Sequence, residues 1–136
     1  MSGREHSAAD PIIPYHQLFS MNSSKAELID LTTLEAVECP CGLARRAFKN
    51  QGFFPGTVHL TDIHRDAKSH FHQEHTEIYV ILSCESDARI ELDGVCHPVK
   101  PLTAVLIPPG VRHRAIGQMQ VLIICNPKFD PEDEQL

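Results

Sequence analysis

The chain has 136 residues, a net charge of −6 and 42% hydrophobic residues, which fits one folded domain without room for a second catalytic one. Its 22% charged residues are typical of globular proteins, so disorder and fibrous repeats are not expected. The acidic balance and the scattered basic residues argue against nucleic acid as a partner. The longest apolar run, residues 121–125, is far shorter than the roughly 20 residues of a membrane span, so we expect no membrane insertion.

Residues 1–24 are predicted to form an N-terminal arm, because Pro11 and Pro14 disfavour a helix around Ile12-Ile13. This apolar pair is too short for a signal peptide, so we expect a cytoplasmic protein. The five cysteines cannot all pair within one molecule, and a chain of this size does not need disulfides for stability. We therefore expect reduced thiols.

The next segment, residues 25–38, has a weak helical pattern that Thr32-Thr33 and Pro40 limit to a turn or two. Short bursts of apolar and β-branched residues then predict strands over residues 43–48, 57–63, 77–82, 88–92, 103–107, 112–116 and 119–125. The Asp93-Gly94 dipeptide predicts a tight hairpin turn, hence antiparallel pairing. Short strands without alternating helices indicate an all-β sandwich or barrel over residues 25–128. Residues 129–136 are expected to form a solvated acidic tail without function.

Histidines gather around the start of the third predicted strand. His70 and His72 are two residues apart, so in a strand they present two imidazoles to one point, as a metal-chelating pair does. Residues 73–76 can turn the chain so that Glu77 adds a carboxylate oxygen there. His113, after the rigid turn of residues 108–110, is a candidate for a third imidazole.

The spacing His70-x-His72-x4-Glu77, followed by Pro108-x-Gly110-x2-His113, resembles the two motifs of the cupin superfamily over residues 57–125. The resemblance implies a small single-domain cupin, that is, a double-stranded β-helix or jelly-roll barrel. It also implies one divalent metal ion held by the four residues His70, His72, Glu77 and His113. The sequence departs from the family at glycine positions, now His64, Cys84 and Leu102, and Gly117 stands where the family often has asparagine. These changes affect turns rather than ligands.

Three imidazoles and one carboxylate leave up to two open positions on an octahedral metal, which suits Fe, Mn, Ni or Zn. The expected function is a small-molecule metalloenzyme of the oxygenase, isomerase or lyase class, such as a metal-dependent dioxygenase or isomerase, acting on a polar metabolite. Alternatives are a non-catalytic cupin that binds or senses a small ligand, and a degenerate cupin without metal. Glu77 is also a candidate base, and Tyr79, which shares its strand face, is a candidate catalytic residue or a core tyrosine.

The remaining polar residues near the motif carry weaker predictions. His75 and His64 lie in turns beside the cluster and are expected to be exposed loop histidines rather than ligands, with substrate contact as the alternative. His59 either lines the barrel mouth or faces water. Arg45 and Arg46 point to opposite faces of their strand, so one of them can project into the barrel and suit a carboxylate or phosphate group.

Two further features bear on assembly and redox chemistry. Ile78, Val80 and Leu82 lie opposite the barrel interior, so another sheet or a second subunit has to cover this apolar face. A homodimer is the simpler prediction. Cys39 and Cys41, one residue apart, are a redox pair, a zinc chelate or two small thiols in a turn, and the last interpretation is favoured.

Overall fold

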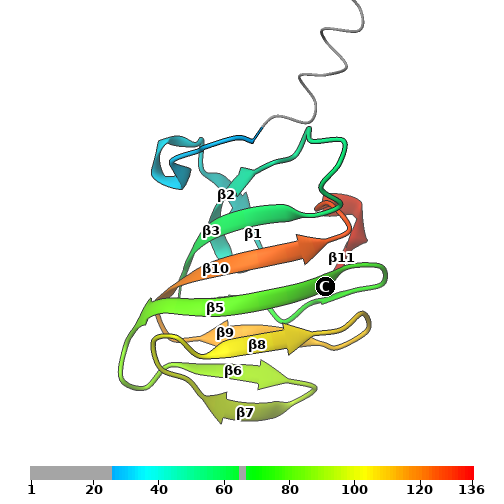
Figure 1. The fold of residues 1–136 in the computed structure, drawn as a ribbon. Helices are drawn as coiled ribbons and strands as arrows, with labels where there is room; N and C mark the ends of the chain where they lie inside the picture. Colours follow the sequence, from blue (N-terminus) through cyan, green and yellow to red (C-terminus); the bar gives the residue numbers. More distant parts are fainter. Residues whose placement is uncertain (1–25, 65–66) are drawn as a thin grey trace, which may run out of the picture.

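The computed structural model describes residues 26–64 and 67–136, so the predicted arm lies outside the described residues. These residues form eleven strands and two single turns of 3-10 helix, drawn in Figure 1. The elements are η1 (Leu31–Thr33), β1 (Val37–Cys39), β2 (Gly42–Ala47), β3 (Thr57–Ile63), β4 (Phe71–His72), β5 (Thr76–Cys84), β6 (Arg89–Leu92), β7 (Val95–Pro98), β8 (Ala104–Ile107), β9 (His113–Ile116), β10 (Met119–Asn126), η2 (Pro131–Asp133) and β11 (Glu134–Gln135). All seven predicted strands are present. In the described part of the chain, no helix is long and apolar enough to cross a membrane.

The strands form an antiparallel barrel of the double-stranded β-helix type. The larger sheet has the order β1-β2-β3-β10-β5-β8, and a smaller sheet has the order β7-β6-β9. A backbone bridge between His70 and His113 connects the chain before β4 to β9. The strands β1, β2 and β3 follow one another in the chain and in the larger sheet, whereas β10 pairs with β3 and β5, which are distant in sequence. The all-β prediction is therefore confirmed.

Strand periodicity sorts the side chains of β5 between the two faces of the larger sheet. Glu77, Tyr79 and Ile81 are buried, while Ile78 and Leu82 are exposed and Val80 is half-buried. The buried face joins a core built of residues from both sheets: Ile63, Tyr79, Ile81, Ile90, Ile107, Val121 and Ile123. Alternation in the sequence therefore predicts correctly which residues of β5 point into the barrel.

The outer face of the larger sheet carries an apolar surface that spans three neighbouring strands. Ile78 pairs with Leu106 on one side and with Ile124 on the other, and Val80 pairs with Leu122. Leu106 is 64% exposed. We call this set the outer apolar face.

Turns show where the chain follows and where it departs from the expected pattern. Asp93 and Gly94 both have positive φ, 46° and 83°, as the predicted two-residue hairpin between β6 and β7 requires. Leu102, at a position where cupins usually have glycine, also has a positive φ of 68°. Over the segment expected to be partly helical, η1 is the one helical turn among the described residues, with Asp30 accepting a hydrogen bond from Thr32 N at its start, and β1 begins at Val37.

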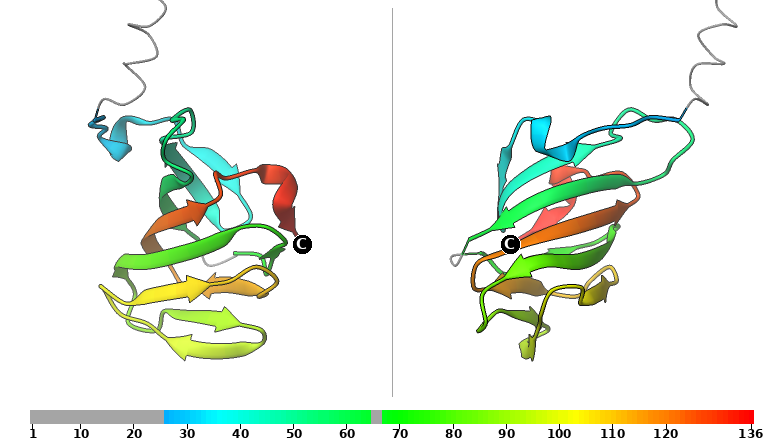
Figure 2. Two further views of the ribbon diagram at one scale, coloured as in Figure 1. Left: turned by 45° about the vertical axis from the view of Figure 1, so that its right-hand side comes forward. Right: turned by 60° about the vertical axis from the view of Figure 1, so that its left-hand side comes forward.

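The C-terminal residues are not a solvated tail, and that prediction is wrong. Figure 2 shows this segment, in red, folded back onto the barrel. Its last strand, β11, pairs with β4, so that Glu134 lies opposite His72. Asp133 is buried, and its carboxylate accepts hydrogen bonds from the backbone N–H groups of residues 73–75. The acidic composition of the segment does not indicate that the Asp133 carboxylate accepts hydrogen bonds from the backbone of residues 73–75.

Candidate metal centre

The four predicted ligands come together inside the barrel. One ligand atom from each of His70, His72, Glu77 and His113 can be chosen so that all lie within 4.8 Å of one another. Each of the four residues is at least 96% buried. His72 lies on β4, Glu77 on β5 and His113 at the start of β9, while His70 precedes β4. Two neighbouring segments, β4 and β5, therefore meet the distant strand β9 at one point.

Backbone pairing fixes two of these histidines relative to each other. His70 N donates to His113 O over 3.1 Å, and His113 N donates to His70 O over 2.8 Å. Their rings lie with centroids 4.3 Å apart. The spacing between these two imidazoles is thus set by a pair of backbone hydrogen bonds rather than by flexible side chains.

Hydrogen bonds to backbone carbonyls also fix the tautomer of both rings. His70 Nδ1 lies 3.0 Å from Lys68 O, and His113 Nδ1 lies 2.9 Å from Val111 O. A carbonyl oxygen only accepts, so each Nδ1 must carry the proton and donate it. In the neutral ring this leaves Nε2 with a lone pair, which is the arrangement that orients a metal-ligating histidine.

The contacts of Glu77 show that the cluster needs a cation. Glu77 Oε2 lies 3.2 Å from His113 Nε2 and 3.3 Å from His72 Nε2. An ionised carboxylate and a neutral imidazole protonated on Nδ1 both present lone pairs, so they repel each other unless a proton or a metal ion lies between them. Both ring nitrogens of His72 are buried and make no hydrogen bond among the described residues. A neutral imidazole has one acceptor nitrogen, and an acceptor without a partner at His72 fits a bound metal ion.

The electrostatic environment keeps His70 and Glu77 in the form that binds metal. Burial lowers the pKa of His70 to about 4, helped by the neighbouring His113, so the His70 ring is neutral at pH 7. Burial raises the pKa of Glu77, but the hydrogen bond with His113 and the close contact with His72 outweigh it and hold that pKa well below its usual range. Burial lowers the pKa of His72, but the contact with Glu77 outweighs this effect, so the pKa of His72 is raised. A carboxylate that stays ionised serves better as a ligand than as a proton acceptor.

His75 is buried, contrary to the prediction of an exposed loop histidine. It is 2% exposed, and its Nδ1 lies 3.3 Å from Asp133 Oδ2. His72, His75 and Asp133 form a second group whose ligand atoms lie within 4.8 Å of one another. Asp133 already accepts backbone hydrogen bonds at 3.0 Å from Gln73 and His75, which makes it a structural anchor for the loop between two ligands. His64, in contrast, is exposed as expected.

Arg46 is the arginine that faces inward. It pairs with His59 across the sheet, and its guanidinium carbon lies 3.8 Å from the centre of the Phe129 ring. His59 is buried, contacts Thr57 Oγ1 at 2.8 Å and has its pKa lowered by burial to about 3. Arg45 points outward and lies 3.4 Å from Asp62. Phe129 is the residue that sequence reasoning missed here, because a single aromatic in a polar segment carries no periodic signal.

Tyr79 lies beside the cluster on the same face of β5 as Glu77. Its ring is buried and packs edge-on against His113, with centroids 5.9 Å apart. Burial raises the pKa of its hydroxyl well above the usual value, so the hydroxyl stays protonated and able to donate.

The barrel and its buried His/Glu cluster define a cupin, and comparison with solved structures agrees. A protein from Planctomyces limnophilus is 44% identical, with a TM-score of 0.80 over 84% of this chain and 99% of that chain. The Streptomyces nucleoside dehydratase Pac13 is 18% identical, with a TM-score of 0.67 over 82% of this chain and 90% of that one. Ectoine synthase from P. lautus is 17% identical, with a TM-score of 0.64 over 79% and 82% of the two chains.

The chain therefore has the cupin fold. No protein-family model matches it, and no curated protein sequence does. The two relatives below 25% identity establish the fold alone.

Proposed function

We propose that the protein is a metal-dependent cupin enzyme that acts on a small polar metabolite, with one divalent ion held by His70, His72, Glu77 and His113. The observation that carries the proposal is the contact of Glu77 Oε2 with two imidazole Nε2 atoms at 3.2 and 3.3 Å. These atoms repel one another unless a proton or a metal ion lies between them, and a metal ion can satisfy all of them at once. A structural zinc site is less suitable, because those sites are usually closed and rich in thiolates.

When bound, the ion would act as a Lewis acid or oxygen activator with open positions for a ligand. The chain itself supplies groups for binding and orientation. Arg46 offers a cationic group beside Phe129, and its buried Nε makes no hydrogen bond among the described residues. An anionic or strongly polar substrate would satisfy this donor. Tyr79 offers a protonated hydroxyl on the strand that carries Glu77.

The similar solved structures support an enzyme rather than a pure binding protein. Pac13 is described as a nucleoside dehydratase and was solved with uridine, and ectoine synthase is named for a synthetic reaction. Both are thus enzymes with small-molecule chemistry on this barrel. The reaction class of the present chain is left open among oxygenase, isomerase and lyase, because one fold hosts many reactions.

Metal analysis tests the proposal directly. Protein purified without chelator, then stripped and reloaded in turn with Fe, Mn, Ni and Zn, should hold about one ion per chain, and metal should raise its melting temperature. His72→Ala should abolish stoichiometric binding and still fold, since the apolar core lies elsewhere. His97→Ala, which removes an exposed histidine on β7, is the matched control and should bind like the wild type. Wild-type protein that binds none of the four metals would refute the site.

Turnover separates the enzyme from a binding or sensing cupin. The metal-loaded protein is incubated with a library of polar metabolites, with oxygen uptake and product mass followed together. The enzyme should convert at least one compound, and His72→Ala should not. A compound that raises the melting temperature but is never converted would favour the binding alternative.

A further inference from the structure

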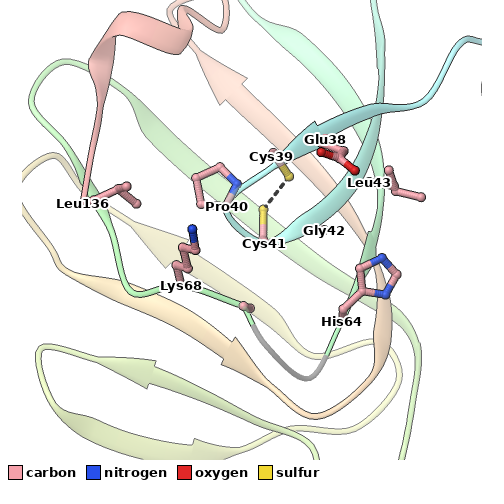
Figure 3. Close-up of a pocket in the computed structure, with 10 residues that line it drawn as sticks. Glu38, Cys39, Pro40, Cys41, Gly42, Leu43, His64, Lys68 and Leu136 are labelled. Carbon is pink, nitrogen blue, oxygen red and sulfur yellow. Dashed lines mark hydrogen bonds between the residues drawn. The ribbon is translucent and has the colours of Figure 1, made fainter.

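The hairpin between β1 and β2 carries two cysteines at the wall of a pocket outside the His/Glu cluster. Cys39 Sγ and Cys41 Sγ lie 3.0 Å apart, and Figure 3 shows the two thiols turned toward each other. The pocket has a volume of about 640 Å³, and Lys68, His64 and Leu136 line it as well. We propose that Cys39 and Cys41 form a reversible dithiol–disulfide site that reacts with low-molecular-weight disulfides.

The backbone holds the two sulfur atoms near bonding distance. A disulfide requires about 2.0 Å between sulfurs, so the pair must close by only about 1 Å. Lys68 N donates to Pro40 O over 2.9 Å, and His64 N donates to Cys41 O over 3.3 Å, which anchors both turn residues to the following loop. Gly42 is packed so tightly against β3 that a Cβ there would overlap the Asp62 carbonyl. The thiols therefore approach each other on a fixed turn.

The two thiols are unequal in the way that disulfide exchange needs. Cys39 is half-buried and lines the pocket, whereas Cys41 is 8% exposed and packs into the core. A hydrogen bond with Cys41 lowers the pKa of Cys39 against the opposing effect of burial, to about 7. The same contact and burial raise the pKa of Cys41 well above its usual value. Cys39 is thus the accessible nucleophile, and Cys41 the resolving thiol.

Two other uses of this pair fit the structure less well. A metal site would need further ligands, but the described residues place no third His, Cys, Asp or Glu ligand atom within 4.8 Å of both sulfurs. A permanent structural disulfide would constrain a loop of only three residues and so stabilise the fold little. A bond that bridges so short a loop is strained, and strained disulfides are the easily reduced ones.

The reaction balances with a small disulfide RSSR as the oxidant. The Cys39 thiolate attacks one sulfur of RSSR, forming a mixed disulfide and releasing RS⁻, which takes up the proton lost by Cys39. Cys41 then loses its proton and attacks Cys39 Sγ, which breaks the mixed bond and releases the second RSH. The pair is oxidised by two electrons, and RSSR is reduced to two thiols.

Glutathione disulfide is a suitable probe, applied to the reduced full-length chain with Cys96 replaced by serine to remove an exposed thiol. Intact mass should fall by two hydrogens, and peptide mapping should locate a Cys39–Cys41 bond that excess reduced glutathione reverses. In Cys41→Ser, the mixed disulfide should remain on Cys39 as one added glutathione. Cys39→Ser should form neither product. The alkylation rate of Cys39 in Cys41→Ser provides an independent check that this thiol is accessible.

The matched control is Cys84→Ser, which removes a half-buried thiol elsewhere and should leave the Cys39–Cys41 bond unchanged. Circular dichroism confirms that each variant is folded. The proposal is overturned if the folded wild-type pair stays reduced in pure glutathione disulfide. It is also overturned if glutathione stays on Cys39 without being displaced by Cys41, or if the bond forms only after unfolding.

Discussion

Asp133 is expected to stabilise the loop that joins two candidate ligands, and Asp133→Ala tests this. The loop of residues 73–75 lies between His72 and Glu77. Its three backbone N–H groups donate to the Asp133 carboxylate, with shortest distances of 3.0 Å in each case. Removing the carboxylate leaves three donors without their acceptor, in a segment where His75 is buried.

The magnitude follows from these three hydrogen bonds. A hydrogen bond to a charged acceptor contributes about 1.5–3 kcal/mol net, but the three donors share one loop and can relax toward water together. We therefore expect Asp133→Ala to lower the free energy of unfolding by about 3 kcal/mol, less than the sum of three independent bonds. For a domain of this size, that corresponds to a fall in melting temperature of about 12 °C. Asp133→Asn keeps one acceptor oxygen and should lose about half as much.

The stabilisation by Asp133 should depend on pH in a defined direction. Burial raises the pKa of Asp133, but hydrogen bonds from the backbone of residues 73–75 outweigh it and lower that pKa in the folded state. The contribution is therefore fully present above the unfolded-state pKa of about 4 and is lost as pH falls through the folded-state value. Wild type and Asp133→Asn should differ in stability at pH 7 and approach each other in acid.

Thermal unfolding followed by circular dichroism is the assay, with Asp130→Asn as the control. Asp130 caps η2 by accepting from Glu132 N, and asparagine caps about as well as aspartate, so this variant should melt like the wild type. An Asp133→Ala variant that melts within a degree of the wild type would refute the reasoning. It would mean that the carboxylate does not hold the loop in solution.

Three further outcomes are expected. In metal-loaded protein, Tyr79→Phe should keep its metal and lower the turnover rate by up to about 10²-fold. If the protein only binds its ligand, the same change should weaken ligand binding by about 1 kcal/mol. An unchanged rate and an unchanged affinity would show that Tyr79 is only a core residue. Light scattering at tens of micromolar should show a homodimer formed through the outer apolar face, and Leu106→Lys should dissociate this dimer. A monomeric wild-type protein would contradict the prediction. Leu102→Gly should relieve the positive φ and raise stability by about 0.5–1 kcal/mol in chemical denaturation, whereas Leu28→Gly, at a fully exposed position, should not.

The sequence predicts the strands and the first ligands because both depend on local periodicity. Alternation along residues 77–82 places Glu77 and Tyr79 on the buried face, and the same period of two puts His70 and His72 on one side. The sequence does not predict the short strands β1 and β7. All four residues of β7 are exposed, and β1 has only three residues, so neither offers a hydrophobic pattern to detect.

The contacts around the loop of residues 73–75 could not be predicted for a different reason. Asp133 is 58–60 residues away from the backbone groups it binds, and a carboxylate that accepts from a distant loop looks the same in sequence as one that faces water. The burial of His75 could not be predicted either, because it follows from the folded-back C-terminal segment. Polar contacts between distant residues leave no periodic pattern in the sequence, so the sequence shows only that polar residues are present.

The same limit explains why the charge state of the cluster emerges only from the structure. Spacing brings Glu77 near the histidines, but only the carbonyl contacts of His70 and His113 show that each Nδ1 carries the proton. With those protons fixed, Glu77 Oε2 and His113 Nε2 are two acceptors 3.2 Å apart, and in the metal-free protein an additional proton has to lie between them. The proposed ion would replace that proton. Metal binding should therefore release protons to the buffer, and metal affinity should fall as pH is lowered.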